Sequence, residues 1–149
     1  MTEDQKEARD IAIRMLSRRE YSRMEIQQKL TRHGCQQDDI DSVLAMLVEN
    51  GAQSDERFAE HYARFRANKG YGPKRIRMEL KEKGVDSPII DHGLEQAEVD
   101  WHERVAEVCR KKFKGQDAVT WEEKSRQSRF LDYRGFTREQ IDFCLGIDD

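Results

Sequence analysis

The same spacing of glycine and apolar residues recurs three times along this chain. Moved by 50 positions, residues 21–44 fall on 71–94 with tyrosine, isoleucine, leucine and glycine in matching places. A further shift of 51 positions brings Gly84 onto Gly135, with a leucine four residues before each. Repeats of this length are single supersecondary units that bury their apolar faces against their neighbours. Three tandem repeats are therefore predicted, at 5–50, 54–97 and 98–147.

Each repeat is predicted to contain three helices. Apolar residues recur at intervals of three and four positions on both sides of the shared glycine, which is the spacing of one buried helix face. In the second repeat this stripe is predicted to run from Phe58 through Tyr62 to Phe65. No stretch alternates apolar and polar residues as a strand would. The predicted fold class is all-α, with three tandem three-helix repeats forming an elongated, curved, solenoid-like body.

Signals for the ends of helices support this pattern. Residues 22–25 and 137–140 have the sequence of a capping box, in which a hydroxyl and a carboxylate or amide satisfy free backbone N–H groups. The two prolines are predicted at the first position of a helix, after Gly72 and Ser87 as N-caps. The glycine shared by the repeats is placed to end a helix in the left-handed conformation.

The composition fits thin helical layers better than one large core. Hydrophobic residues make up 36% of the chain and charged residues 38%, against about 45–50% and about 25% in typical globular proteins. The net charge is only −3, but basic residues gather in 14–32 and 57–83, whereas 86–103 is acidic. Such blocks predict charged surfaces that matter for partners.

The cysteines and the apolar runs indicate the compartment. Cys35, Cys109 and Cys144 are an odd number without a CxxC pair, and each lies among apolar positions, so three buried thiols are predicted. We expect no secretory leader and no membrane span, because no apolar run approaches about 18 residues. A reducing cytoplasm is the predicted location.

No motif predicts catalysis. The Gly70–Gly72 turn lacks the third glycine and the preceding strand of a nucleotide-binding loop. The four histidines lack the spacing of metal ligands, and no serine or cysteine has the sequence context of a nucleophile. We therefore expect a protein that is not an enzyme and that holds no metal or cofactor.

The strongest functional signal is a basic cluster around the Gly70–Gly72 turn. The turn should bring together cations that end one helix and cations that begin the next. The helix dipole favours the first group and disfavours the second, so the second group indicates an anionic partner. The aromatic residues between them are predicted to be core. The predicted contact residues are Arg64, Arg66, Lys69, Lys74, Arg75 and Arg77, with Arg110, Lys111 and Lys112 as a secondary cluster.

Residues 69–84, which read KGYGPKRIRMELKEKG, resemble the RecX family of bacterial regulators of the RecA recombinase. Matching segments at 17–22, 54–58 and 129–136 extend the resemblance over residues 5–147. The family resemblance implies three tandem three-helix repeats, in agreement with the repeats identified above.

The resemblance also implies a function and a partner. It implies a monomeric, cytoplasmic regulator in DNA repair, recombination and the SOS response, with no membrane association. Such a protein would bind along the helical groove of the RecA–single-stranded DNA filament and inhibit strand exchange, ATP hydrolysis and coprotease activity. Weak direct binding of single- or double-stranded DNA is a further implication.

Two alternatives remain open at the level of the sequence. Three-helix units also occur in helix-turn-helix proteins that bind DNA directly, although a pI of about 5.9 is far below the value above about 9 that is usual for DNA-binding domains. The other alternative is a non-catalytic helical scaffold that binds a protein partner through its acidic faces.

Overall fold

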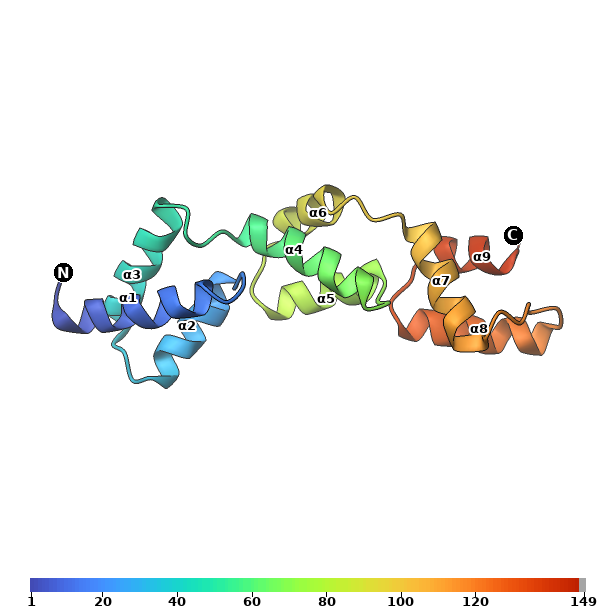
Figure 1. The fold of residues 1–149 in the computed structure, drawn as a ribbon, viewed down its shortest axis with the longest axis horizontal. Helices are drawn as coiled ribbons and strands as arrows, with labels where there is room; N and C mark the ends of the chain where they lie inside the picture. Colours follow the sequence, from blue (N-terminus) through green and yellow to red (C-terminus); the bar gives the residue numbers. More distant parts are fainter. Residues whose placement is uncertain (148–149) are drawn as a thin grey trace. The chain divides into compact units, whose positions relative to one another are not determined.

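The computed structural model describes residues 1–147, and this part of the chain contains nine α-helices and no strand (Figure 1). The helices follow one another in three sets of three, so the all-α prediction and the tandem repeats are confirmed. Their bounds are α1 Glu3–Leu16, α2 Arg23–Arg32, α3 Gln37–Glu49, α4 Asp55–Asn68, α5 Pro73–Glu82, α6 Ser87–Gln96, α7 Trp101–Phe113, α8 Trp121–Tyr133 and α9 Arg138–Leu145.

The chain folds into two compact units. Unit 1 comprises Met1–His61 and Leu80–Gly93, and unit 2 comprises Tyr62–Glu79 and the chain from Leu94 onward. Helices α4 and α5 each contribute residues to both units. No helix in residues 1–147 is long and apolar enough to cross a membrane.

Unit 1 contains a core formed by α1, α2 and α3. Nine apolar side chains from these helices are buried to at least nine-tenths, at the intervals of three and four that the sequence predicts. They are Ala8, Ile11, Ala12, Ile26, Leu30, Ile40, Val43, Leu44 and Leu47.

Unit 2 contains the corresponding core of α7, α8 and α9. Val105, Leu131 and Phe136 are fully buried at its centre, and Phe113 meets Phe130 edge to face with ring centres 5.6 Å apart. Cys109 is buried in the same core, as predicted. The prediction of burial is wrong for the other two cysteines, which are half-buried: Cys35 lies in the turn between α2 and α3, and Cys144 lies in the last turn of α9.

The helix ends follow the predicted signals with one exception. Capping boxes are present at Ser22 and Thr137, and Gly84 and Gly135 have φ values of 81° and 100°. Helix α5 begins at its proline, as predicted. Helix α6, however, begins at Ser87 itself, because the carbonyl of the preceding residue already accepts the first helical hydrogen bond at 2.9 Å. Ser87 is therefore inside the helix rather than its N-cap.

The apolar stripe of α4 also differs from the prediction. Phe58 and Ala63 are buried, but Phe65 is 57% exposed. The buried stripe continues at Ala67 instead. Ala67 is four positions after Ala63 and so returns to the same helix face, whereas Phe65 is two positions after Ala63 and points away from it. Phe65 is thus a surface aromatic residue.

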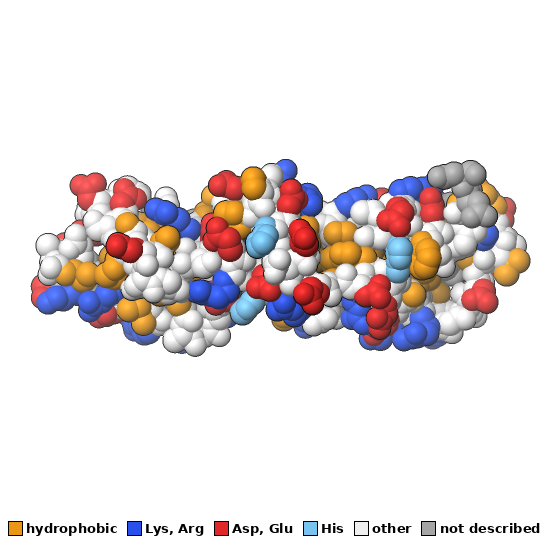
Figure 2. Space-filling view, turned by 90° about the horizontal axis from the view of Figure 1, so that it is seen from above, with side chains coloured by type: hydrophobic (Ala, Val, Ile, Leu, Met, Phe, Trp, Pro, Cys, Tyr) orange, Lys and Arg blue, Asp and Glu red, His pale blue; other side chains and the backbone are white. Residues whose placement is uncertain are grey.

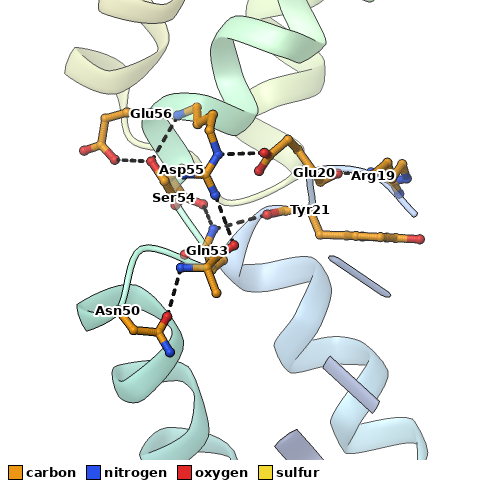
Figure 3. Close-up of polar contacts among 10 residues, drawn as sticks. Arg19, Glu20, Tyr21, Asn50, Gln53, Ser54, Asp55 and Glu56 are labelled. Atoms are coloured by element: carbon orange, nitrogen blue, oxygen red, sulfur yellow. Dashed lines mark hydrogen bonds and ion pairs between the residues drawn. The ribbon is translucent and has the colours of Figure 1, made fainter. Parts of the chain in front are cut away.

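A polar junction in unit 1 holds the α3–α4 connection against the α1–α2 connection (Figure 3). The buried Gln53 side chain donates hydrogen bonds to the carbonyl oxygen of Tyr21 at 3.2 Å and to Asp55 Oδ1 at 2.9 Å. Arg57 Nε donates to Glu20 Oε1 at 2.6 Å. A buried amide must find partners inside the protein, so these contacts fix the α1–α2 connection in place.

A backbone contact in unit 2 joins the start of α5 to the turn between α8 and α9. The N–H of Gly72 donates to the carbonyl of Arg134 at 2.8 Å, and that of Lys74 donates to the carbonyl of Gly135 at 2.9 Å. A Cβ atom on Gly72 would lie 2.4 Å from the backbone of Gly135. The approach therefore requires glycine, although the backbone of Gly72 itself has no left-handed φ.

We expect Gly72→Ala to lower the free energy of unfolding by about 3 kcal/mol, because it overpacks the contact and weakens its hydrogen bonds. Gly115→Ala is the matched control in unit 2, since that position has a φ of 74° and no neighbour within 4 Å of a new Cβ. The control should lose only about 1 kcal/mol through backbone strain. Denaturant unfolding followed by circular dichroism measures both, and equal losses would contradict the proposed clash.

Candidate functional site

Two of the predicted basic residues, Arg66 near the end of α4 and Arg75 near the start of α5, converge on one carboxylate in unit 2. Arg66 binds Glu79 through two nitrogens, with Nε 2.9 Å from Oε1 and Nη2 2.8 Å from Oε2. Arg75 Nε lies 3.4 Å from Oε2, and the Tyr62 hydroxyl donates to Oε1 at 2.9 Å. The turn between α4 and α5 therefore brings Arg66 and Arg75 together, as expected.

Three guanidinium groups surround the ring of Tyr71. The Cζ atoms of Arg66, Arg75 and Arg134 lie 3.9, 4.6 and 4.9 Å from the ring centre. Arginine stacks well on an aromatic face, where the ring attracts its charge. We call Arg66, Tyr71, Arg75, Glu79 and Arg134 the Tyr71 cluster.

Glu79 remains ionised at neutral pH within this cluster. Burial raises the pKa of Glu79, but hydrogen bonds from Arg66 and Tyr62 outweigh it, so the net pKa lies below the ordinary value. The hydrogen bond to Glu79 raises the pKa of Arg66. Glu79 binds two of the three guanidinium groups, those of Arg66 and Arg75, and it is the one carboxylate of the Tyr71 cluster, so the cluster keeps an excess of positive charge.

A basic groove of about 290 Å³ opens beside this cluster, between α7, α8 and the α4–α5 turn. Five cations and one carboxylate line it over an apolar floor that includes Phe130. The carboxylate, Glu107, pairs with Arg104 and lies 3.1 Å from Lys111 Nζ. We call this the Lys69 groove; its charged lining residues are Lys69, Arg104, Glu107, Lys111, Lys112 and Arg134.

The Lys69 groove joins the two basic clusters that the sequence indicates. Lys69 belongs to the main cluster, whereas Lys111 and Lys112 belong to the secondary one, and all three side chains are exposed. A concave surface with excess positive charge suits a polyanion, since phosphate or carboxylate groups of a partner can replace solvent around the cations.

The other predicted site residues lie outside the Lys69 groove. Lys74 pairs with Asp132 at 3.0 Å on the surface, and such exposed pairs contribute little to stability. Arg64 and Arg110 are exposed and Arg77 is half-buried, but none of the three lines the groove. The structure therefore brings together part of the predicted set.

Two arginines of the site were not predicted. Arg134 contributes to both the Tyr71 cluster and the Lys69 groove, and its guanidinium reaches the carbonyl oxygen of Lys69 at 3.4 Å. Its presence in the family-like segment 129–136 was the available signal. Arg104 has acidic residues on both sides in the sequence, so counting charges along the chain hides it.

Basic and acidic side chains are mixed on the face of the molecule shown in Figure 2. This mixing agrees with the local ion pairs described above. On this face the excess positive charge is not gathered into one patch.

Within the described residues no group of three or more His, Cys, Asp and Glu side chains is placed to hold a metal ion. His102 stacks on Phe143 with ring centres 3.9 Å apart, and its Nε2 lies 3.0 Å from Glu139 Oε1. A hydrogen bond from Cys109 lowers the pKa of Cys144 to about 7. The contacts of His102 and Cys144 are therefore parts of the packing between α7 and α9.

Models of the RecX family match the chain in three consecutive segments. They are described as the first, second and third three-helix domains of RecX, and they match residues 8–47, 54–94 and 98–145.

Relatives named Regulatory protein RecX are similar over most of the chain. The one from Pseudomonas entomophila is 43% identical over 141 residues, which are 95% of this chain and 91% of the relative. One from Legionella pneumophila is 45% identical over 132 residues, which are 89% of this chain and 88% of the relative. A crystal structure of RecX from Lactobacillus salivarius matches the fold with a TM-score of 0.80 at 22% identity, over 99% of both chains.

The pH dependence of stability tests the Tyr71 cluster. Because the pKa of Glu79 is lower in the folded protein, its contribution is present above the ordinary pKa of 4.5 and is lost as the pH falls through the lowered value. Glu79→Gln should cost about 1–3 kcal/mol at pH 7, since it leaves charged donors unmatched. The variant should also lose less stability than the native protein on acidification.

The control for this prediction is Glu122→Gln, which changes an exposed carboxylate of α8 in the same unit. Urea unfolding at several pH values measures both effects. A Glu79→Gln variant with the native pH dependence would contradict the role given to this carboxylate.

Proposed function

Because the chain belongs to the RecX family of regulatory proteins, we propose that it inhibits the RecA recombinase by binding along the helical groove of the RecA–single-stranded DNA filament. Bound there, it would limit strand exchange, ATP hydrolysis and coprotease activity. The observation that carries the proposal is the Lys69 groove, in which five cations face a single carboxylate. The filament offers two kinds of anion to such a groove, protein carboxylates and DNA phosphates.

The proposed contact residues divide into two kinds. Arg66 and Arg75 are held against Glu79 and Tyr71, so they fix the shape of the surface and add positive charge to it. Exposed cations are available to the filament itself. This group contains Lys69, Lys74, Lys111 and Lys112, and the proposed contact set is completed by Arg64, Arg77 and Arg110.

In the proposed mechanism the protein inhibits by steric hindrance and by restraining the movement of recombinase subunits. We take residues 5–50, 54–97 and 98–147 as three successive repeats that contact neighbouring recombinase subunits. A protein that bridges subunits blocks access of duplex DNA to the filament groove and restrains the rotations of subunits that accompany ATP hydrolysis. No catalytic group or cofactor is needed for this action, and we propose a non-enzymatic, monomeric protein of the cytoplasm.

Weak direct binding of single- or double-stranded DNA is part of the proposal, because the Lys69 groove presents cations to any phosphate backbone. If the protein instead acted as a sequence-selective DNA-binding protein, it would bind duplex DNA tightly without recombinase. If it were a general helical scaffold, it would not sediment with the nucleoprotein filament.

Neutralising the exposed lysines of the groove should weaken inhibition. We expect Lys69→Gln/Lys111→Gln/Lys112→Gln to raise the concentration that halves RecA ATP hydrolysis on single-stranded DNA by about tenfold, because three contacts of roughly 0.5 kcal/mol each are lost. The Tyr71 cluster is untouched in this variant, so its helical circular dichroism should be native.

The matched control removes three positive charges of unit 2 that lie outside the groove, as Lys114→Gln/Lys124→Gln/Arg129→Gln. It should inhibit as the native protein does. Equal inhibition by both variants would show that the Lys69 groove is not part of the contact surface, although the protein would still be an inhibitor.

Salt should weaken the inhibition if the contacts are ionic. Charges on exposed surfaces are screened at a Debye length of about 8 Å at physiological ionic strength and about 3 Å at 1 M. We therefore expect native inhibition to decline steadily as potassium chloride rises in the ATPase assay, with RecA alone as the reference at each concentration. Inhibition that does not depend on salt would indicate apolar docking.

A further inference from the structure

Two cysteines of the third repeat meet in the core of unit 2. Cys109 lies in α7, and Cys144 lies in the last turn of α9, which packs beside α7 (Figure 1). Cys109 belongs to the buried core, whereas Cys144 is half-buried and packs against that core. Their thiols are hydrogen-bonded to each other. The fold therefore brings together two free thiols that lie far apart in the sequence.

The packing of α9 against α7 holds the two cysteines in place. His102, Val105 and Cys109 recur at intervals of three and four positions, so they share one face of α7. At the start of this face, His102 stacks on Phe143 of α9 and lies 3.0 Å from Glu139 of the same helix. Val105 follows and is fully buried. Cys109 thus lies on a face of α7 that is already in contact with α9.

A buried amide gives the Cys109 proton a second acceptor. Gln127 of α8 is only 3% exposed, and its Oε1 accepts a hydrogen bond from Cys109 Sγ at 3.2 Å. A thiol has one proton to donate, and here the acceptors are Gln127 and the sulfur of Cys144. Cys109 can donate to Gln127 while Cys144 is a thiol, and to Cys144 when that group is a thiolate. The core therefore accommodates both forms of Cys144.

The remaining cysteine has the opposite environment. In unit 1, burial and the nearby carboxylates of Glu7 and Asp39 raise the pKa of Cys35, so its thiol stays protonated at neutral pH. In unit 2 the hydrogen bond from Cys109 lowers the pKa of Cys144 to about 7, against the opposing effect of burial. The thiolate is the nucleophilic form of cysteine. Cys144 is thus the more reactive thiol, and Cys35 serves as an internal control.

We propose that Cys144 and Cys109 form a peroxide-sensitive dithiol, a modification site at which oxidation links α9 covalently to α7. The Cys144 thiolate attacks one oxygen of hydrogen peroxide and the O–O bond breaks, which leaves a sulfenic acid on Cys144 and, with one proton, releases water. The Cys109 thiol then attacks the Cys144 sulfur, and hydroxide leaves with the Cys109 proton as a second water. Two thiols become one disulfide, and one peroxide is reduced by two electrons.

The arrangement of the pair has the features of a redox-sensing site. Such a site needs an accessible thiol that ionises readily and a resolving thiol beside it. Cys144 is partly exposed and Cys109 is its immediate neighbour. In a reducing compartment, such as the cytoplasm that we propose for this protein, the pair rests as two thiols and forms a disulfide only when an oxidant is present.

The disulfide would stabilise unit 2. It closes a loop of about 35 residues, which removes conformational freedom from the unfolded chain. The loop contains the whole of α8, so the link holds all three helices of the third repeat together. The proposal does not depend on the function proposed above, because its tests require neither RecA nor DNA.

Peptide mapping of the full-length protein tests the link. Reduced protein, freed of reductant, is treated with excess hydrogen peroxide, its remaining thiols are blocked with N-ethylmaleimide, and it is digested with trypsin. The three cysteines fall in separate tryptic peptides, 33–57, 105–110 and 139–149. We expect mass spectrometry to find 105–110 linked to 139–149, and 33–57 with a blocked thiol. Blocked thiols in all three peptides would overturn the proposal, as would a link to 33–57.

Thermal unfolding followed by circular dichroism measures the effect of the link. We expect peroxide to raise the Tm of the native protein by at least about 5 °C, and dithiothreitol to reverse the rise. Cys144→Ser should show no rise, whereas the matched control, Cys35→Ser, should behave as the native protein does. An equal rise in Cys144→Ser would overturn the proposal, and so would an unchanged Tm in the native protein.

Alkylation of the native protein tests which thiol attacks first and requires no variant. At pH 7 we expect iodoacetamide to modify Cys144 about fivefold faster than Cys35, because its larger thiolate fraction outweighs the lower nucleophilicity of a less basic thiolate. The two rates are read from peptides 139–149 and 33–57. Equal rates would overturn the assignment of Cys144 as the attacking thiol.

Discussion

The basic surface of unit 2, which we propose as a contact surface, depends on hydrogen bonds between two segments of backbone. The N–H groups of Gly72 and Lys74 meet the carbonyls of Arg134 and Gly135 at 2.8 and 2.9 Å. These N–H groups belong to the start of α5, where a helix has no internal partners for them. The contact satisfies them and also brings Arg134 against the ring of Tyr71. Without it, Arg134 would not lie beside Tyr71, and Lys69 of the α4–α5 turn would not share a surface with the cations of α7.

Some cations of the chain are paired within the protein, whereas others line a groove in which carboxylates are scarce. On the Tyr71 cluster they are paired internally, and their charge supports the fold around Glu79. In the Lys69 groove they outnumber carboxylates by five to one. A chain with a net charge of −3 can therefore offer local binding surfaces for anions, since the excess is concentrated in concavities rather than averaged over the molecule.

Much of the fold could be predicted from local chemistry. Capping boxes and the spacing of apolar residues depend on neighbours within a few positions, so they could predict the three helices of each repeat. The buried residues of α1–α3 also follow the predicted spacing. Phe65 was mispredicted because an aromatic residue near an apolar stripe looks like core until the angle around the helix is counted. The start of α6 was placed one residue late because serine and proline suit neighbouring positions at a helix start.

The candidate site was harder to predict because its partners are distant in the sequence. Arg134 and Tyr71 are brought together by tertiary contacts, and nothing in the spacing of residues near Tyr71 indicates Arg134. The pairing of Arg66 with Glu79 likewise depends on how α4 packs against α5, and it gives a predicted contact residue a partner within the protein. The basic residues of 14–32 were visible as a block, but only the structure shows that five of them line one groove with a single carboxylate, Glu25.

Titration of the native protein into a RecA ATPase assay on single-stranded DNA tests the central claim most directly. We expect ATP hydrolysis to fall in proportion to the amount of protein that sediments with the filament. Unchanged hydrolysis when the protein has saturated the filament in the sedimentation assay would contradict it.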